Sequence, residues 1–266
     1  MAKPKVIVLR AAGTNCDAET AFAFETVGAK VELVHINRLI SKEKKINDYR
    51  ILAIPGGFTY GDDIASGKIL ANEIKYKLKE DLRKFISDGK IIIGICNGFQ
   101  VLVKSGLLPD INENFESIEA TLSLNDSAKF EDRWVYLRDT RYATRDTKCI
   151  WTKGVEEIIY LPVAHAEGKF IPKNEGILKK LKENNQIVFT YCDEEGQSGG
   201  YPCNPNGSIG DIAGICDITG RVFGLMPHPE RHIHYTQHPY WTRIPKKNEG
   251  DGLKIFSNGV EFMRNI

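Results

Sequence analysis

Residues 91–103 read Ile-Ile-Ile-Gly-Ile-Cys-Asn-Gly-Phe-Gln-Val-Leu-Val. The apolar run over 91–95 predicts a buried strand and the residues after Asn97 predict a helix, so Cys96 stands on the turn between them. Glycines two residues before and after the cysteine are typical of a nucleophile elbow, because so tight a turn leaves no room for Cβ atoms. A helix that begins at a thiol also stabilises its thiolate, the form that attacks. The stretch predicts an α/β fold with Cys96 as nucleophile; the alternative is a cysteine that merely packs beside the sheet.

The first 110 residues alternate predicted strands with predicted helices. Strands are expected at 5–10, 31–35, 50–54 and 91–95, and helices at 17–28 and 69–87. This alternation is typical of βαβ units. We therefore expect a three-layer, flavodoxin-like, mostly parallel sheet with helices on both faces, in a single domain that spans residues 1–266.

The second half of the chain has a less regular pattern. Strands are expected at 133–137, 158–163, 187–192 and 221–226, helices at 176–183 and 252–263, and an irregular loop at 196–211. The segments 111–150 and 232–250 have no assigned role.

Composition excludes several classes of function. The chain of 266 residues is 42% hydrophobic and 27% charged, and its net charge is +1, so no basic field indicates nucleic-acid or membrane binding. The apolar run at 6–9 is too short for a signal peptide or a membrane span. Six cysteines include no CxxC pair, so neither a zinc site nor a redox site is predicted. Reduced thiols and a cytoplasmic location are expected.

A candidate base follows the strand predicted at 221–226. His228, Pro229 and Glu230 are consecutive. A thiol nucleophile needs a group that takes and returns a proton near neutral pH, which histidine does. Proline biases the preceding residue toward extended backbone, where residues i and i+2 point to one side, so Glu230 can orient an imidazole that faces Cys96. The alternative is a surface His-Pro turn. Three further histidines at 232, 234 and 238 are spaced without nearby acids, and no metal site is predicted.

Paired glycines follow the strand predicted at 50–54. Residues 55–62 read Pro-Gly-Gly-Phe-Thr-Tyr-Gly-Asp, which matches neither of the common phosphate-binding glycine motifs. Glycine lets backbone N–H groups approach a ligand closely. We interpret Gly57 and Asn97 as the two N–H donors of an oxyanion hole, with a tight turn or a phosphate cradle as alternatives.

Together these segments resemble class I, triad-type glutamine amidotransferases, and among them the glutaminase subunits of phosphoribosylformylglycinamidine synthase. The resemblance runs from about residue 5 to residue 262. Its motifs lie at 56–62, 94–100, 164–170, 201–208, 212–215 and 226–231. The cysteine and His-Pro-Glu motifs specify the class, and the segments 58–62, 165–168 and 204–208 narrow it to this synthase.

The resemblance implies a role for each catalytic candidate. Cys96 attacks the side-chain amide of L-glutamine and forms a γ-glutamyl thioester, with release of ammonia. His228 shuttles the proton and Glu230 orients it. Gly57 and Asn97 stabilise the tetrahedral oxyanion.

The resemblance also implies substrate-binding residues and partners. Gln100, His165 and Glu167 are the substrate-binding candidates, although the segment around His165 and Glu167 is equally compatible with a partner interface. Ammonia passes to a larger, PurL-like synthetase subunit that uses ATP and magnesium to make formylglycinamidine ribonucleotide in purine biosynthesis. A small, PurS-like third subunit completes the complex, and this chain carries no cofactor of its own.

Other functions remain open from the sequence. The chain could be the glutaminase of another amidotransferase, such as one that feeds GMP or carbamoyl phosphate synthesis. It could also be a stand-alone cysteine hydrolase of the DJ-1-like type, or a regulatory partner with a decayed site. Residues 63–68 depart from short family members, and we expect the loop 58–68 to be the element that a partner positions.

Overall fold

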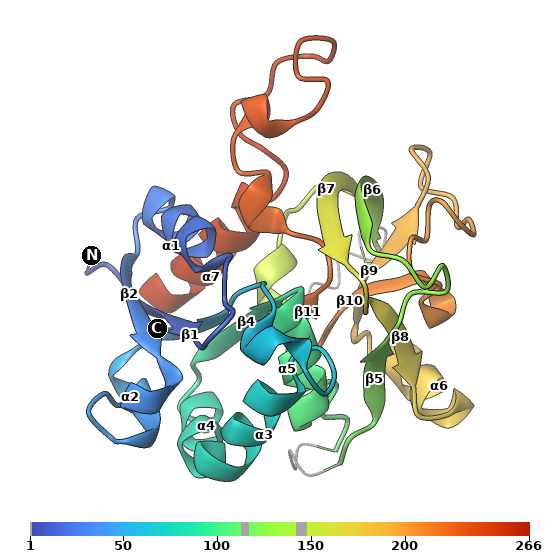
Figure 1. The fold of residues 1–266 in the computed structure, drawn as a ribbon. Helices are drawn as coiled ribbons and strands as arrows, with labels where there is room; N and C mark the ends of the chain where they lie inside the picture. Colours follow the sequence, from blue (N-terminus) through green and yellow to red (C-terminus); the bar gives the residue numbers. More distant parts are fainter. Residues whose placement is uncertain (1, 113–116, 142–147) are drawn as a thin grey trace.

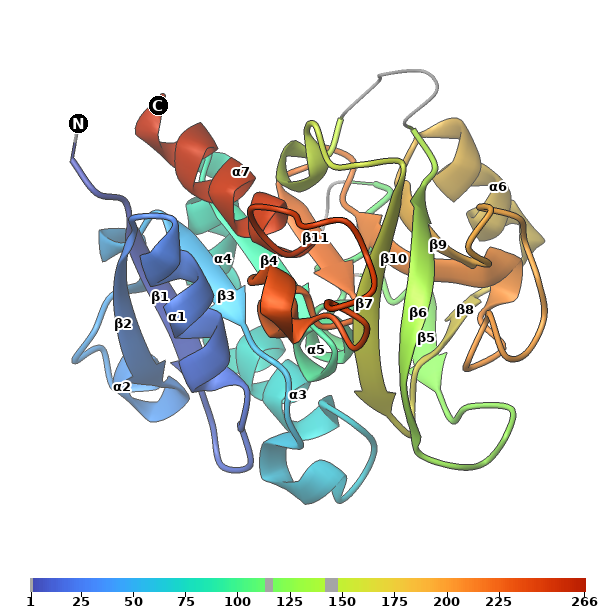
Figure 2. The same cartoon turned by 90° about the horizontal axis from the view of Figure 1, so that it is seen from above.

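The computed structural model describes residues 2–112, 117–141 and 148–266. Among these residues nine strands form one sheet, in the order β2-β1-β3-β4-β11-β10-β9-β6-β7 (Figure 1). The strands are β1 (Lys5–Arg10), β2 (Lys30–His35), β3 (Ile51–Ile54), β4 (Ile91–Ile95), β6 (Glu131–Asp139), β7 (Ile158–His165), β9 (Ile187–Cys192), β10 (Ile212–Cys216) and β11 (Val222–Leu225). Figure 2 shows the sheet from above, with β2 at one side of the molecule and β6 and β7 toward the other.

One half of the sheet is parallel and confirms the predicted α/β class. Strands β2, β1, β3, β4 and β11 pair in parallel, which is the flavodoxin-like strand order. The helices α1 (Asp17–Thr26) and α7 (Leu253–Arg264) cover one face, and α3 (Lys68–Lys77), α4 (Lys79–Ser87) and α5 (Asn97–Ser105) cover the other (Figure 1). Every residue of β3, β4 and β11 is buried, as expected for strands covered on both faces.

The other half of the sheet is antiparallel, which the sequence pattern did not indicate. Strand β10 pairs antiparallel with β11 and β9, and β6 pairs antiparallel with β9 and β7. A separate two-stranded sheet joins β5 (Ala120–Ser123) to β8 (Lys169–Pro172), and α6 (Glu175–Glu183) follows β8. Residues 113–116 and 142–147 of the unassigned segment 111–150 lie outside the described residues.

The single helix predicted at 69–87 is wrong, because the chain breaks at Leu78. The backbone there has φ −123° and ψ 6°, which ends α3 and begins α4. Leu78 itself is buried. The break lets this side chain enter the core while each helix buries its own apolar face.

The segment 232–250 projects from the edge of the sheet at β7 (Figure 1). Residues at and beside its two ends cap that edge: His228 N–H donates to Pro162 O at 2.8 Å, and His232 Nδ1 lies 2.8 Å from Tyr160 O. Asp251 Oδ2 accepts the Tyr160 N–H at 2.9 Å. These contacts occupy backbone groups that would otherwise pair with a foreign strand. Among the described residues, no helix combines the length and apolar character needed to cross a membrane.

Close packing of α5 against β3 gives a prediction about stability. A Cβ placed on Gly98 would lie 1.8 Å from Ile54 O, so Gly98→Ala must displace helix from strand. We expect a loss of about 3 kcal/mol in the free energy of unfolding, measured by urea titration. Gly200→Ala is the control, because no heavy atom lies within 4 Å of the position that its new methyl group would occupy. Equal stability of the two variants would contradict the packing.

Candidate active site

Cys96 occupies the turn between β4 and α5, at the carboxyl edge of the parallel strands. Its backbone has φ 52° and ψ −105°, a conformation that non-glycine residues rarely adopt. The Cys96 N–H donates to Leu225 O at 2.8 Å, which fixes the turn against the end of β11. The sulfur lies 3.7 Å from Ala164 O. The turn thus has the geometry of a nucleophile elbow.

His228 and Glu230 form a buried pair beside this turn. His228 Nδ1 lies 2.7 Å from Glu230 Oε1, and each residue is 2% exposed. Within the described part of the chain, His228 Nε2 and Glu230 Oε2 have no hydrogen-bond partner. His228 has extended backbone, as Pro229 predicts, with φ −102° and ψ 91°. The pair leaves one imidazole nitrogen available for proton transfer.

The charges around His228 favour its protonated form. Burial alone lowers the pKa of the imidazole, but the Glu230 carboxylate and the neighbouring Cys96 and Cys16 together raise the pKa well above its ordinary value. A protonated imidazole beside Cys96 stabilises the thiolate and supplies a proton to a leaving group.

A cavity of about 160 Å³ joins segments that are distant in sequence. It is lined by Asn15, Cys16, Gly57, Phe58, Cys96, Phe130, Ala164, His228 and Arg231. Larger hollows of about 510 Å³ and 400 Å³ lie elsewhere, and neither includes Cys96 or His228 among its lining residues. The cavity at Cys96 is therefore the candidate active site despite its smaller volume.

Gly57 lines the cavity, whereas Asn97 is not among the lining residues but directly follows Cys96 in the chain. Gly57 has φ 140°, and a Cβ there would lie 2.7 Å from Asn15 N, so only glycine fits. Asn97 is the first residue of α5, so its N–H lies outside the helical hydrogen-bond ladder. The Asn97 side chain accepts from Thr59 Oγ1 at 2.7 Å and donates to Gln100 Oε1 at 2.9 Å.

Gln100, His165 and Glu167 are not among the residues that line the cavity. Gln100 Nε2 donates to Glu167 O, so both ends of its amide bond within the chain. His165 Nδ1 lies 3.2 Å from Asn125 Oδ1, and burial lowers the pKa of His165 to about 3. Its imidazole is neutral at physiological pH. Substrate binding by these three residues remains a prediction.

Sequence reasoning missed Cys16 and Arg231. Cys16 Sγ, a nitrogen of His228 and a carboxylate oxygen of Glu230 lie within 4.8 Å of one another. Arg231 Nη2 donates to Cys16 Sγ at 3.1 Å, and a cationic guanidinium on this sulfur disfavours a metal ion there. The sequence held one usable signal, since residues 15–17 follow β1 and carboxyl ends of parallel strands meet at one edge.

The chain is similar to known glutamine amidotransferases over nearly its whole length. The family model of the CobB/CobQ-like glutamine amidotransferase domain matches residues 3–263. The chain is 48% identical to phosphoribosylformylglycinamidine synthase subunit PurQ of Dehalococcoides mccartyi, with 100% of both chains covered. It is 46% identical to the subunit of that name from Methanococcus maripaludis, with 97% of each covered.

A solved structure shows the same fold. One chain in the structure of PurLQS from Thermotoga maritima superposes with a TM-score of 0.73 and 29% identity, over 98% of this chain and 99% of that one. The match extends over the antiparallel half as well as the parallel half. The chain belongs to the PurQ family of glutamine amidotransferases.

Proposed function

We propose that the chain is the glutaminase subunit of a phosphoribosylformylglycinamidine synthase, and that it hydrolyses L-glutamine through Cys96. The observation that carries the chemistry is the cavity that joins the strained Cys96 turn to the buried His228–Glu230 pair. Nucleophile, base and orienting carboxylate are the three groups that this reaction needs.

The first half of the reaction forms a thioester. The Cys96 thiolate attacks the side-chain carbonyl carbon of glutamine, forming a C–S bond, and the carbonyl oxygen becomes an oxyanion. The N–H groups of Gly57 and Asn97 stabilise this oxyanion. The C–N bond then breaks, and protonated His228 gives its proton to the departing nitrogen, which leaves as ammonia.

The second half restores the enzyme. Neutral His228 takes a proton from water while the water oxygen attacks the thioester carbon. The C–S bond breaks, glutamate leaves and Cys96 returns to the thiolate. Glu230 holds the imidazole through Nδ1 in both halves, since their 2.7 Å contact is buried.

The ammonia is delivered to a larger subunit with which the chain forms a complex. We assign ATP and magnesium to that PurL-like subunit, no cofactor to this chain, and the third place in the complex to a small PurS-like subunit. The cytoplasm is the expected compartment for this step of purine biosynthesis.

Exposed apolar side chains beside the cavity suit a partner contact. Phe58 is 44% exposed and Phe130 is 49% exposed, with ring centroids 6.3 Å apart, and Ile64 in the same loop as Phe58 is 73% exposed. Such a group on a soluble protein indicates an interface. It supports the expectation that the loop 58–68 is positioned by the larger subunit.

Ile64→Asp tests this interface. A buried charge replaces an apolar contact, so we expect affinity for the larger subunit to fall about tenfold or more, as measured by sedimentation or surface binding. Ile266→Asp is the control, because Ile266 is similarly exposed but lies at the far carboxyl terminus. An unchanged affinity of the Ile64 variant would place the interface elsewhere.

The assembled synthase tests the proposed function. Glutamine labelled with ¹⁵N in its side-chain amide is supplied with formylglycinamide ribonucleotide, ATP, magnesium and the partner subunits. We expect ¹⁵N in the amidine product. Glutamine hydrolysis without labelled product would favour another amidotransferase or a stand-alone hydrolase. Product from ammonia but none from glutamine would refute the glutaminase assignment.

A further inference from the structure

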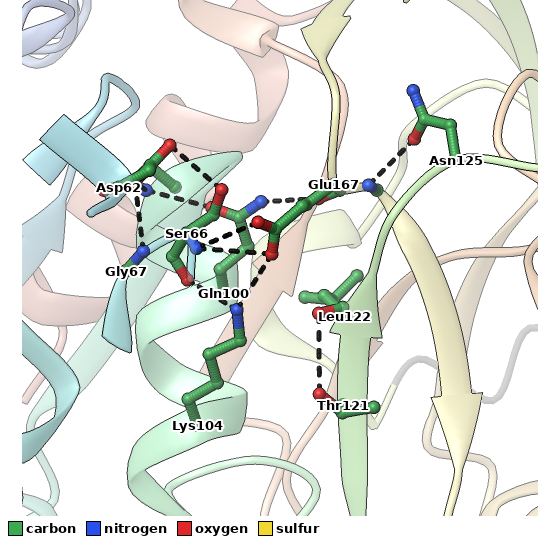
Figure 3. Close-up of polar contacts among 11 residues, drawn as sticks. Asp62, Ser66, Gly67, Gln100, Lys104, Thr121, Leu122, Asn125 and Glu167 are labelled. Atoms are coloured by element: carbon green, nitrogen blue, oxygen red, sulfur yellow. Dashed lines mark hydrogen bonds and ion pairs between the residues drawn. The ribbon is translucent and has the colours of Figure 1, made fainter. Parts of the chain in front are cut away.

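A largely buried polar network joins α5 to the loop 59–67 and to the turn between β7 and β8. Its core is a pair formed by Lys104, near the end of α5, and Glu167, in the turn between β7 and β8 (Figure 3). Lys104 Nζ lies 3.2 Å from Glu167 Oε2. The same ammonium donates to Ser66 O at 2.6 Å, and both carboxylate oxygens of Glu167 accept the Ser66 N–H at 3.2 Å. The pair thus holds Ser66 by both of its backbone groups.

Asp62 extends the network toward the nucleophile turn. Its Oδ2 accepts from Ser66 Oγ at 2.9 Å, and its Oδ1 accepts from Gly67 N–H at 3.2 Å. Asn97 Nδ2 donates to the same Oδ1 at 3.3 Å. Asn97 Oδ1 in turn accepts from Thr59 Oγ1 at 2.7 Å. The side chain of Asn97 therefore joins the nucleophile turn to Thr59 directly, and to Ser66 and Gly67 through Asp62.

These contacts include one proposed oxyanion donor, Asn97, and come near the other, Gly57, at Thr59. Asn97 carries one donor on its own backbone, and Gly57 precedes Thr59 by two residues. The Gln100 amide, three residues beyond Asn97, links Asn97 Nδ2 to Glu167 O. A displacement of the loop 59–67 would therefore change the position of the Gly57 N–H group relative to the Asn97 N–H group.

Burial makes the network sensitive to the loss of one member. Lys104 is buried and the Glu167 side chain is 18% exposed. Burial lowers the pKa of Lys104, while Glu167 opposes that shift. Removing one partner of a buried ion pair leaves the other charge uncompensated, whereas the intact pair adds little net stability. A pair of this kind is suited to fixing geometry rather than to raising stability.

We infer that Glu167 and Lys104 are positioning residues for the glutaminase: they hold the loop 59–67 so that the N–H groups of Gly57 and Asn97 converge on one oxyanion. The inference rests on the proposed function and gives Glu167 a role other than contact with glutamine. Ile64 lies exposed in the same loop, so a partner that contacts the loop acts on the oxyanion hole through this network.

The two roles for Glu167 differ in their kinetic effect. A residue that binds glutamine in the ground state raises KM when it is removed. Removal of a residue that positions oxyanion donors lowers kcat and leaves KM nearly unchanged, because the oxyanion exists only along the reaction path.

The experiment measures kcat and KM for glutamine in the assembled synthase with Glu167→Gln, Lys104→Met and the double variant. We expect each single variant to lower kcat about 10- to 100-fold with KM changed less than about threefold. The double variant should be no slower than the slower single variant, since the two residues act as one unit. Synthesis from ammonia should be unaffected.

Two controls keep the outcome decisive. Glu183→Gln disrupts the exposed Lys179–Glu183 pair at 3.6 Å on α6 and should leave kcat unchanged. Ser66→Ala removes only the Oγ contact to Asp62. It replaces the charge variants in the test if circular dichroism shows that they do not fold. We expect it to lower kcat by a smaller factor than the charge variants do.

A raised KM with unchanged kcat would assign Glu167 to substrate binding and overturn the inference. Unchanged kcat and KM in every network variant would overturn it as well. A wild-type complex that does not use glutamine would instead refute the proposed function, so the two failures are distinguishable.

Discussion

Cys96→Ser is expected to reduce glutamine-dependent amidine synthesis by about 10⁴-fold or more while synthesis from ammonia continues. A serine hydroxyl on the same turn is far less acidic than a thiol, so the charged nucleophile is lost. Ammonia needs no thioester, and the larger subunit should accept it from solution. Steady-state rates with glutamine and with ammonium chloride, measured on the same assembled preparation, give the two numbers.

Cys203→Ser provides the matched control. Cys203 is a free, partly exposed thiol in the loop 196–211 and does not line the cavity at Cys96. Its replacement should leave both rates at the wild-type level. Retention of glutamine-dependent activity in the Cys96 variant would show that another group is the nucleophile, and Cys16 in the same cavity would be examined first.

Glu230→Gln is expected to lower kcat for glutamine by about 10³-fold. The amide oxygen can still accept a hydrogen bond from Nδ1–H, but the charge that stabilises the imidazolium is lost. Since the Glu230 carboxylate raises the pKa of His228, its removal lowers that pKa. The basic limb of the pH profile of kcat should therefore move to lower pH.

The raised pKa of His228 also makes the stability of the fold depend on pH. His228 has a folded-state pKa above its unfolded value, so its charge stabilises the fold below about pH 6.5. This contribution is lost as the pH rises through the folded-state pKa. The stability difference between wild type and Glu230→Gln should accordingly shrink at high pH. Glu261→Gln, on the exposed face of α7, is the control for both measurements. If the basic limb of the kcat profile does not move in Glu230→Gln, the proposed pairing of His228 with Glu230 is contradicted.

The parallel half of the fold was predictable because its signals are local. The strands β3 and β4 are continuous apolar runs between helix-forming segments, and a parallel sheet requires such runs. Cys96, His228 and Gly57 could be predicted to lie together because each follows such a strand, and the carboxyl ends of parallel strands share one edge; the three residues line one cavity. Pro229 predicted the extended backbone that His228 has in the fold.

The antiparallel half depends on pairing between distant segments. Strands β5 and β8 are each four residues long, and β10 contains Gly214, so none carries a strong local pattern. Neighbouring strands supply the backbone hydrogen bonds that hold these strands in their sheets. Sequence periodicity does not show which strands are neighbours.

Part of the site was unpredictable for the same reason. Arg231 reaches Cys16 across 215 positions, and the Lys104–Glu167 pair spans 63 positions. The role expected for Gln100 took account of its motif but not of the two bonds that occupy its amide in the fold. Contacts of this kind emerge only when the strands and turns are assembled.

Mass spectrometry after exposure to 6-diazo-5-oxo-L-norleucine, a glutamine analogue, tests the central claim most directly. The thiolate displaces N₂ from the protonated diazo carbon and forms a stable C–S bond. We predict one adduct on Cys96 in the assembled complex, prevented by excess glutamine and absent in Cys96→Ala. An adduct on another residue, or no adduct in the complete complex with its nucleotide, would contradict the account.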